Sequence, residues 1–140
     1  MAVSAKKWEL VRTRANFACE YCGVTEEDVG GLLTVDHFYP KSRGGKDDVN
    51  NLVYCCPQCN VFKSDYTSSP KTPHDLWNPR EEPLSNHALL VADGKLHPIT
   101  TTGNLTLAPL HLNRPHLIRH RKRRLDNAAS MLYSRVWAIC

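Results

Sequence analysis

The chain has 140 residues, of which 41% are hydrophobic and 23% are charged, and its formal net charge is +4. This length and composition suit one globular domain, or a small core with an extension. No apolar run approaches the roughly 20 residues that a membrane-spanning helix needs, and residues 1–7 lack the apolar stretch of a secretory signal. We therefore expect a cytoplasmic protein that has no membrane partner.

Residues 6–16 predict a short amphipathic helix, because Trp8, Val11 and Ala15 recur at helical spacing and form one apolar face. Arg12 and Arg14 lie off that face. Each could contact phosphate or could simply be solvated, and the solvated state is the slightly better expectation for each one alone.

Four of the six cysteines form two Cys-x-x-Cys pairs, Cys19 with Cys22 and Cys56 with Cys59. In a reducing cytosol such pairs are more often metal sites than disulfides. Thiolates suit Zn²⁺, so we predict one structural zinc ion bound by all four cysteines. Cys55 is expected to be a small buried side chain.

The residues between the two cysteine pairs predict a strand, a loop, a strand and a helix. Residues 32–38 are rich in β-formers and end before Pro40, residues 41–46 form a flexible basic loop, and residues 51–55 form the second strand. Pro57 suits the first turn of a helix that runs to about residue 65. This places Asp36 and His37 on the first strand and Asn60 on the helix.

The order of these motifs resembles the HNH endonucleases of the ββα-metal (His-Me finger) group. The matching pattern is Cys-x-x-Cys, Asp-His-x-x-Pro-x-Ser-x-Gly-Gly, Asn-Leu and Cys-x-x-Cys-Asn-x-x-Lys, over about residues 12–65. The resemblance implies an α+β fold with a small ββα-metal core. It also implies metal-dependent hydrolysis of phosphodiester bonds in DNA, and we expect the substrate to be double-stranded. We expect a nuclease core over residues 1–66 and a C-terminal extension, packed on that core, over residues 67–140.

Phosphodiester hydrolysis needs a base for the attacking water and a positive charge for the phosphate oxygens. His37 is the expected base, because a neutral imidazole can accept the proton. Asp36 and Asn60 offer the oxygen ligands that Mg²⁺ or Mn²⁺ prefers. Since neighbours on a regular strand face opposite sides, Asp36 and His37 need a local irregularity to serve one site. The resemblance further implies that Asn51 hydrogen-bonds near His37 and fixes its orientation.

The second half of the chain predicts a linker, a hairpin and a helix. Residues 66–73 are rich in Ser, Thr and Pro. Residues 87–99 predict a hairpin with a two-residue turn at Asp93-Gly94. The last helix is expected to begin at Asn113 as its N-cap, with Pro115 in the first turn. Its apolar stripe comprises Leu117, Ile118, Leu125, Ala129, Leu132 and Val136.

Basic residues at two places are candidates for contacts with DNA phosphates. Lys41, Arg43 and Lys63 lie in or near the central motif, and each is about as well explained as a solvated residue. The last helix carries a run of four cations, which would position a duplex without reading its bases: Arg121, Lys122, Arg123 and Arg124. Among the histidines outside the motif, which are expected to be surface or packing residues, His87 is the first to examine.

A second class of function stays open. The chain could be a zinc-stabilised nucleic-acid-binding module without catalytic activity, and a toxin or defence effector is a weaker third possibility. The joint presence of Asp36, His37, Asn51 and Asn60 favours the nuclease.

Overall fold

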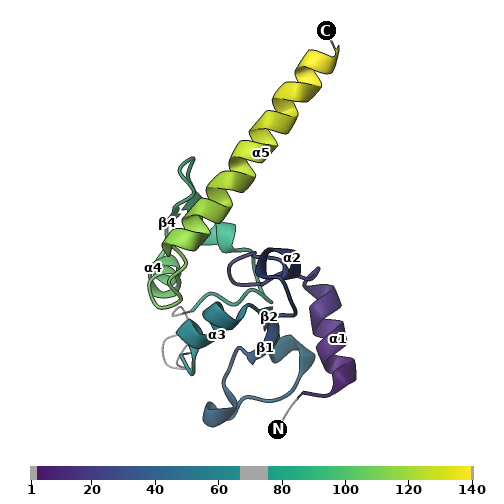
Figure 1. Cartoon of the computed structure of the whole chain (residues 1–140). Coiled ribbons are helices and arrows are strands. Elements are labelled where there is room, and N and C mark those ends of the chain that lie inside the picture. Colours follow the sequence, from purple (N-terminus) through teal and green to yellow (C-terminus); the bar gives the residue numbers. More distant parts are fainter. Residues whose placement is uncertain (1–2, 67–75, 140) are drawn as a thin grey trace.

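The computed structural model describes residues 3–66 and 76–139, with side chains as far as residue 131 (Figure 1). Most of the predicted linker lies outside this description. So do the side chains of Leu132 and Val136, which belong to the predicted stripe. The helices and strands form an α+β fold with two small antiparallel sheets, which confirms the expected class. The elements are α1 Ala5–Arg14, α2 Glu26–Val29, β1 Thr34–His37, η1 Lys41–Arg43, η2 Val49–Asn51, β2 Leu52–Cys55, α3 Pro57–Lys63, η3 Leu84–Asn86, β3 Ala88–Leu90, β4 Leu96–Pro98, α4 Thr101–Leu107 and α5 Pro115–Ile139.

Helix α1 forms where the apolar spacing predicts it and packs on the first sheet. The side chain of Ser4 accepts a hydrogen bond from the Lys7 amide, which satisfies one of the free donors at the helix start. Val11 is fully buried, and the Trp8 ring meets the Tyr54 ring edge-on with centroids 5.7 Å apart. The helix therefore covers β2 with its apolar face.

The two arginines of α1 are neither free for phosphate nor simply solvated. Arg12 Nε donates to the Glu26 carboxylate over 2.6 Å, and Arg14 donates to the carbonyl oxygens of Val49 and Leu52. Arg12 and Arg14 were expected either to contact phosphate or to be solvated, and these intramolecular hydrogen bonds contradict both alternatives. The guanidinium groups join α1 to α2 and to the segment before β2.

Strands β1 and β2 pair antiparallel, with Asp36 opposite Val53 and His37 opposite Leu52. All four residues of β2 are buried, because α1 covers the strand and the core lies beneath it. Pro57 is the first residue of α3, as predicted, and α3 packs on β1. The strand, loop, strand and helix of the sequence prediction therefore form one compact ββα unit.

The second hairpin has a longer turn than predicted. Val91 N donates to Lys95 O and Gly94 N to Val91 O, so three residues, not two, separate the paired ends. Gly94 has φ +90°, and a Cβ there would lie 2.2 Å from the Ile118 carbonyl oxygen of α5. Glycine is needed both for the left-handed backbone and for this close approach. Helix α4, which the sequence analysis did not predict, packs on β4.

Helix α5 starts at Pro115, one residue later than an N-cap at Asn113 would place it. The Asn113 amide is not its N-cap, because its oxygen accepts from Leu96 N and its nitrogen donates to Leu96 O, each over 2.8 Å. The Asn113 side chain therefore makes both hydrogen bonds with the Leu96 backbone that a residue of a neighbouring strand would make. Leu117 is buried, whereas Ala129 is exposed, so only the first turns of the predicted stripe pack on the body. Figure 1 shows the far half of α5 projecting away from the other elements.

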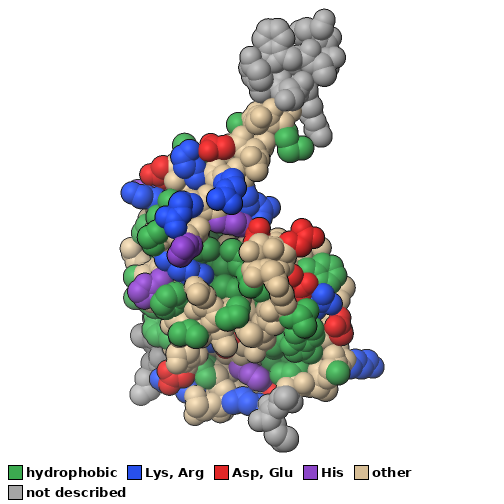
Figure 2. All heavy atoms as spheres, viewed as in Figure 1, with side chains coloured by type: hydrophobic (Ala, Val, Ile, Leu, Met, Phe, Trp, Pro, Cys, Tyr) green, Lys and Arg blue, Asp and Glu red, His purple; other side chains and the backbone are tan. Residues whose placement is uncertain are grey.

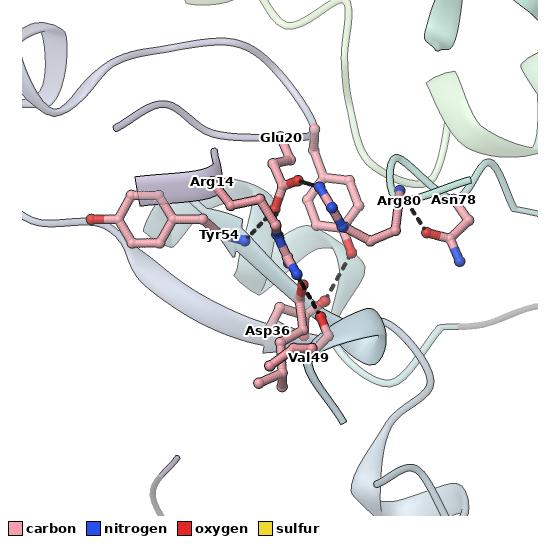
Figure 3. Close-up of polar contacts among 9 residues, drawn as sticks. Arg14, Glu20, Asp36, Val49, Tyr54, Asn78 and Arg80 are labelled. Atoms are coloured by element: carbon pink, nitrogen blue, oxygen red, sulfur yellow. Dashed lines mark hydrogen bonds and ion pairs between the residues drawn. The ribbon is translucent and has the colours of Figure 1, made fainter. Parts of the chain in front are cut away.

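One hydrophobic core joins residues before and after the linker. Leu76, Leu110 and Leu117 belong to the same buried cluster as Val11 and Tyr54. Polar contacts also cross this boundary, since Arg80 donates to the Glu20 carboxylate, which in turn accepts from Tyr54 N over 2.8 Å. Figure 3 shows Arg14 and Arg80 converging on Glu20.

Candidate metal centre and active site

Two turns of the chain bring the four paired cysteines together. Their Sγ atoms all lie within 4.8 Å of one another, and the Sγ atoms of Cys22 and Cys56 are 3.7 Å apart. Each pair shares one local geometry, in which the amide of the second cysteine donates to the sulfur of the first over 3.4 Å. These cysteines are not in disulfides. The four sulfurs are positioned to bind one metal ion.

The donor set fits tetrahedral Zn²⁺. Four thiolates at the usual Zn–S distance of about 2.3 Å would lie roughly 3.8 Å from one another, close to the separation seen between Cys22 and Cys56. Hydrogen bonds among the four cysteines lower the pKa of Cys56 and raise those of Cys22 and Cys59. A thiolate is the form that binds metal.

Arg114, just before α5, is a further donor to the cysteine cluster. Its guanidinium lies 3.5 Å from Cys59 Sγ and 3.8 Å from Cys56 Sγ. Although burial opposes the charged form, the neighbouring cysteines raise the pKa of Arg114. A cation at this position offsets the negative charge of four thiolates around a divalent ion. The second half of the chain thus contributes directly to the metal centre.

Asp36 lies between the cysteine cluster and α3. Its Oδ2 accepts from the Tyr21 hydroxyl over 3.0 Å and from Lys63 Nζ over 2.9 Å. Burial, with the nearby Asp36 charge, raises the pKa of Tyr21, so that hydroxyl stays protonated and donates. Within the described part of the chain, Asp36 Oδ1 makes no hydrogen bond. It is not one of the buried polar atoms that lack a partner there, so it keeps contact with solvent. Oδ1 is therefore the carboxylate atom left to bind an ion.

Lys63 is not the surface phosphate contact that the sequence suggested. Its side chain is 0% exposed, and its ammonium donates to the Asp36 carboxylate and, over 3.1 Å, to the His37 carbonyl oxygen. The reason is its position on α3, on the side that packs against β1. Lys63 therefore holds the end of β1 and balances the buried charge of Asp36.

His37, the last residue of β1, hydrogen-bonds to a carboxylate that the sequence analysis did not single out. The His37 Nε2 atom lies 2.7 Å from Asp47 Oδ1. The bonds to His37 and then to Lys41 lower the pKa of Asp47, so it is ionised near neutral pH. An ionised carboxylate only accepts, so Nε2 carries the proton and Nδ1 is the basic nitrogen. The sequence did not single out Asp47, because the path of the loop between Lys41 and Asp47 decides whether this carboxylate reaches His37.

Asn51 does not contact the His37 ring. Its side chain instead bonds to the loop backbone, accepting from Tyr39 N and donating to Tyr39 O and Lys46 O. The loop returns close to its own start, and a Cβ on Gly45 would lie 1.7 Å from Tyr39 O. Asn51 therefore hydrogen-bonds to the backbone of the loop that carries Asp47, close to His37 in sequence, and not to the imidazole itself.

Asn60 lies one turn before Lys63 on α3, so both side chains lie along the same side of the helix. The Asn60 side chain is half-buried, and its amide group makes no hydrogen bond within the described part of the chain. The side-chain oxygen is therefore free to bind an ion. In that same part of the chain, no contact joins the Asp36 carboxylate to the His37 ring. They are neighbours at the end of β1, and Lys63 contacts the Asp36 carboxylate and the His37 carbonyl oxygen.

Two of the proposed phosphate contacts lie on the loop beside His37. Lys41 is exposed and its ammonium lies 3.2 Å from Asp47 Oδ1. Arg43 is 55% exposed and its nearest acidic oxygen, on Asp65, is 4.0 Å away. Lys41 shares the Asp47 carboxylate with His37, so its ammonium lies close to a ligand that would approach His37.

The basic run of α5 is divided between different environments. Arg121 is directed inward, where it donates to Gly94 O and Leu112 O, and burial lowers its pKa. Lys122 pairs with Asp126 over 2.9 Å. Arg123 and Arg124 are exposed. The four cations therefore do not form one phosphate-binding face, and Arg121 is a structural residue.

His87 is a structural residue of the second half. Its Nδ1 lies 2.7 Å from the Thr100 hydroxyl, and its Nε2 contacts the Glu82 carboxylate. These contacts join the segment before β3 to the start of α4. This geometry agrees with the packing role expected for His87 as a histidine outside the central motif.

Comparison with known proteins identifies the central unit. Residues 19–65 match the family model of the HNH endonucleases. The matched range begins at the first cysteine of the metal centre and includes β1, β2 and α3. Searches of curated proteins and of solved structures gave no match. None of the helices in the described part of the chain combines the length and apolar content needed to cross a membrane.

Proposed function

Since residues 19–65 form an HNH endonuclease domain, we propose that the protein hydrolyses phosphodiester bonds of double-stranded DNA with His37 as general base and one divalent ion. The observation that supports this most directly is the hydrogen bond between His37 Nε2 and Asp47 Oδ1. It leaves Nδ1 as the basic nitrogen, in a side chain that is 17% exposed.

The attacking water would lose its proton to His37 Nδ1. Asp47 holds the imidazole in the tautomer that can accept it, and favours the imidazolium that forms. Asn51 supports this arrangement indirectly, because it anchors the loop that carries Asp47. Lys41 and Arg43, on the same loop, would bind phosphates beside the scissile bond.

Asp36 Oδ1 and the Asn60 amide oxygen are the ligands available for Mg²⁺ or Mn²⁺, and both are hard oxygen donors that suit such an ion. When bound, a divalent ion there would stabilise charge on the scissile phosphate and the leaving oxygen. Tyr21 and Lys63 hold the other carboxylate oxygen, so Asp36 is oriented before an ion arrives. Cys19, Cys22, Cys56 and Cys59 would hold a separate, structural Zn²⁺.

A plasmid assay separates the nuclease from a binding module without activity. The protein is incubated with supercoiled plasmid, linear duplex, single-stranded DNA or RNA, with Mg²⁺, with Mn²⁺ or with no added divalent ion. Omitting the ion is preferable to adding a chelator, which could also strip the cysteine site. We expect metal-dependent cleavage of duplex DNA. Tight DNA binding without cleavage under any metal condition would instead support the binding module.

A further inference from the structure

We propose that a groove between the start of α5 and the cysteine-bearing turns binds the phosphodiester backbone of duplex DNA through Arg119 and Arg123. The groove has a volume of about 460 Å³ and is open to solvent. The inference rests on the proposed function, because that function supplies the polyanion. Of the four cations that the sequence suggested as phosphate contacts, it keeps Arg123, and it adds Arg119.

One face of α5 supplies the basic side of the groove. His116, Arg119, His120 and Arg123 all line it, and their spacing of three, four and seven residues places them on one side of a helix. The opposite wall comes from α2 and from the first turn of α3. Figure 2 shows Lys, Arg and His side chains gathered where α5 meets the body.

Arg119 and Arg123 are the cations of this face that remain available. Both are exposed, and neither pairs with an acidic side chain within the described residues. Among the described residues, the hydrogen-bond partner of the Arg119 guanidinium is the His116 ring, at 3.1 Å. Arg114 also lines the groove, but its guanidinium is directed at the cysteine sulfurs. Arg119 and Arg123 thus lack the intramolecular partners that Arg121 and Lys122 have.

Among the described residues that line the groove, Asp28 is the one acidic residue, and its carboxylate already has hydrogen-bond partners. Its carboxylate accepts from Thr25 N and lies 2.9 Å from His120 Nε2. These bonds, the one from the Thr25 backbone first, lower the pKa of Asp28. The groove therefore presents two guanidinium groups without acidic partners, beside one carboxylate that already has hydrogen-bond partners, and this suits an anionic backbone.

The test compares two double variants that remove the same charge from the same helix. The variants are Arg119→Gln with Arg123→Gln, and Lys122→Gln with Arg124→Gln, whose side chains do not line the groove. Affinity for a labelled duplex is measured by fluorescence anisotropy across a salt series, without divalent ions. For the groove variant we expect weaker binding to any sequence and a log–log salt slope smaller by up to about 1.8, since each phosphate contact contributes about 0.9.

The matched variant should lose clearly less affinity and keep a slope near that of the wild type. Equal slopes for the wild type and the groove variant would refute the inference, as would equal losses in the two variants, which would show an effect of net charge alone. The assay measures binding only. A protein that binds through the groove but never cleaves would therefore refute the proposed nuclease and leave this inference standing.

Discussion

The hydrogen bond between His37 and Asp47 decides which imidazole nitrogen can act as a base. Replacing Asp47 by Asn removes the charge and permits the other tautomer, so we expect a lower kcat with little change in KM. The loss should be smaller than the roughly 10²- to 10⁴-fold expected for removal of a general base itself. Single-turnover cleavage measures it. Asp48→Asn, one residue on and exposed, is the matched control, and equal rates for both variants would contradict the positioning role.

The same pair predicts a pH dependence of stability. The pKa of Asp47 in the folded protein lies below its ordinary value of 3.8, chiefly because of the bond to His37. A depressed folded pKa stabilises the protein above the unfolded pKa, and that contribution disappears as the pH falls through the folded value. The stability difference between wild type and Asp47→Asn should thus be present at neutral pH and vanish in acid. Urea titrations at pH 7 and at a pH well below 3.8 measure it, and a constant difference would contradict this assignment.

Lys63 and Asp36 form a buried ion pair, and breaking it should be costly. Lys63→Met leaves the Asp36 carboxylate with only the Tyr21 hydroxyl, so we expect the free energy of unfolding to fall by about 3–5 kcal/mol. Urea unfolding gives the value, with Lys46→Met at an exposed position as control. A change within about 0.5 kcal/mol, the range of ordinary surface substitutions, would show that the pair is unimportant. For the same reason Asp36→Asn is a better probe of ion binding than Asp36→Ala.

At the level of elements, Arg114 connects the start of α5 to the cysteine cluster. Partners that hydrogen-bond to metal ligands typically change metal affinity by about 10- to 100-fold. We expect Arg114→Gln to bind Zn²⁺ correspondingly more weakly, in competition with a chromophoric chelator. Arg119→Gln is the matched control, because Arg119 lines the same groove without contacting a sulfur. If Arg114→Gln bound Zn²⁺ as tightly as the wild type, the guanidinium would contribute to packing and not to metal binding.

The elements that the sequence predicted well are those determined by local pattern. The apolar spacing of α1, the β-rich runs of β1 and β2 and the proline at the start of α3 each act within a few residues. Helix α4 was missed because it contains Gly103 and the threonines Thr101, Thr102 and Thr106, which have low helix propensity. The Asn113 side chain was misassigned because its partner, Leu96, is distant in sequence.

At the level of the whole molecule, the candidate site was predictable as a set of residue types but not as a set of contacts. The cysteine spacing identified the metal centre, because two pairs of such spacing have few other uses. The partners of Asp36, His37 and Lys63 depend on how α3 and the loop fold back onto β1, which no local pattern reports. Arg114 and the groove on α5 depend on packing between the two halves of the chain.

The central claim is that His37 is the base of a metal-dependent DNA endonuclease. The most direct measurement is single-turnover nicking of supercoiled plasmid in Mg²⁺ or Mn²⁺ by wild type, His37→Ala and His97→Ala, an exposed histidine outside the family match. The account predicts nicking by the wild type and by His97→Ala, and a rate lower by about 10²- to 10⁴-fold for a folded, DNA-binding His37→Ala protein. Nicking by His37→Ala at the wild-type rate would contradict it.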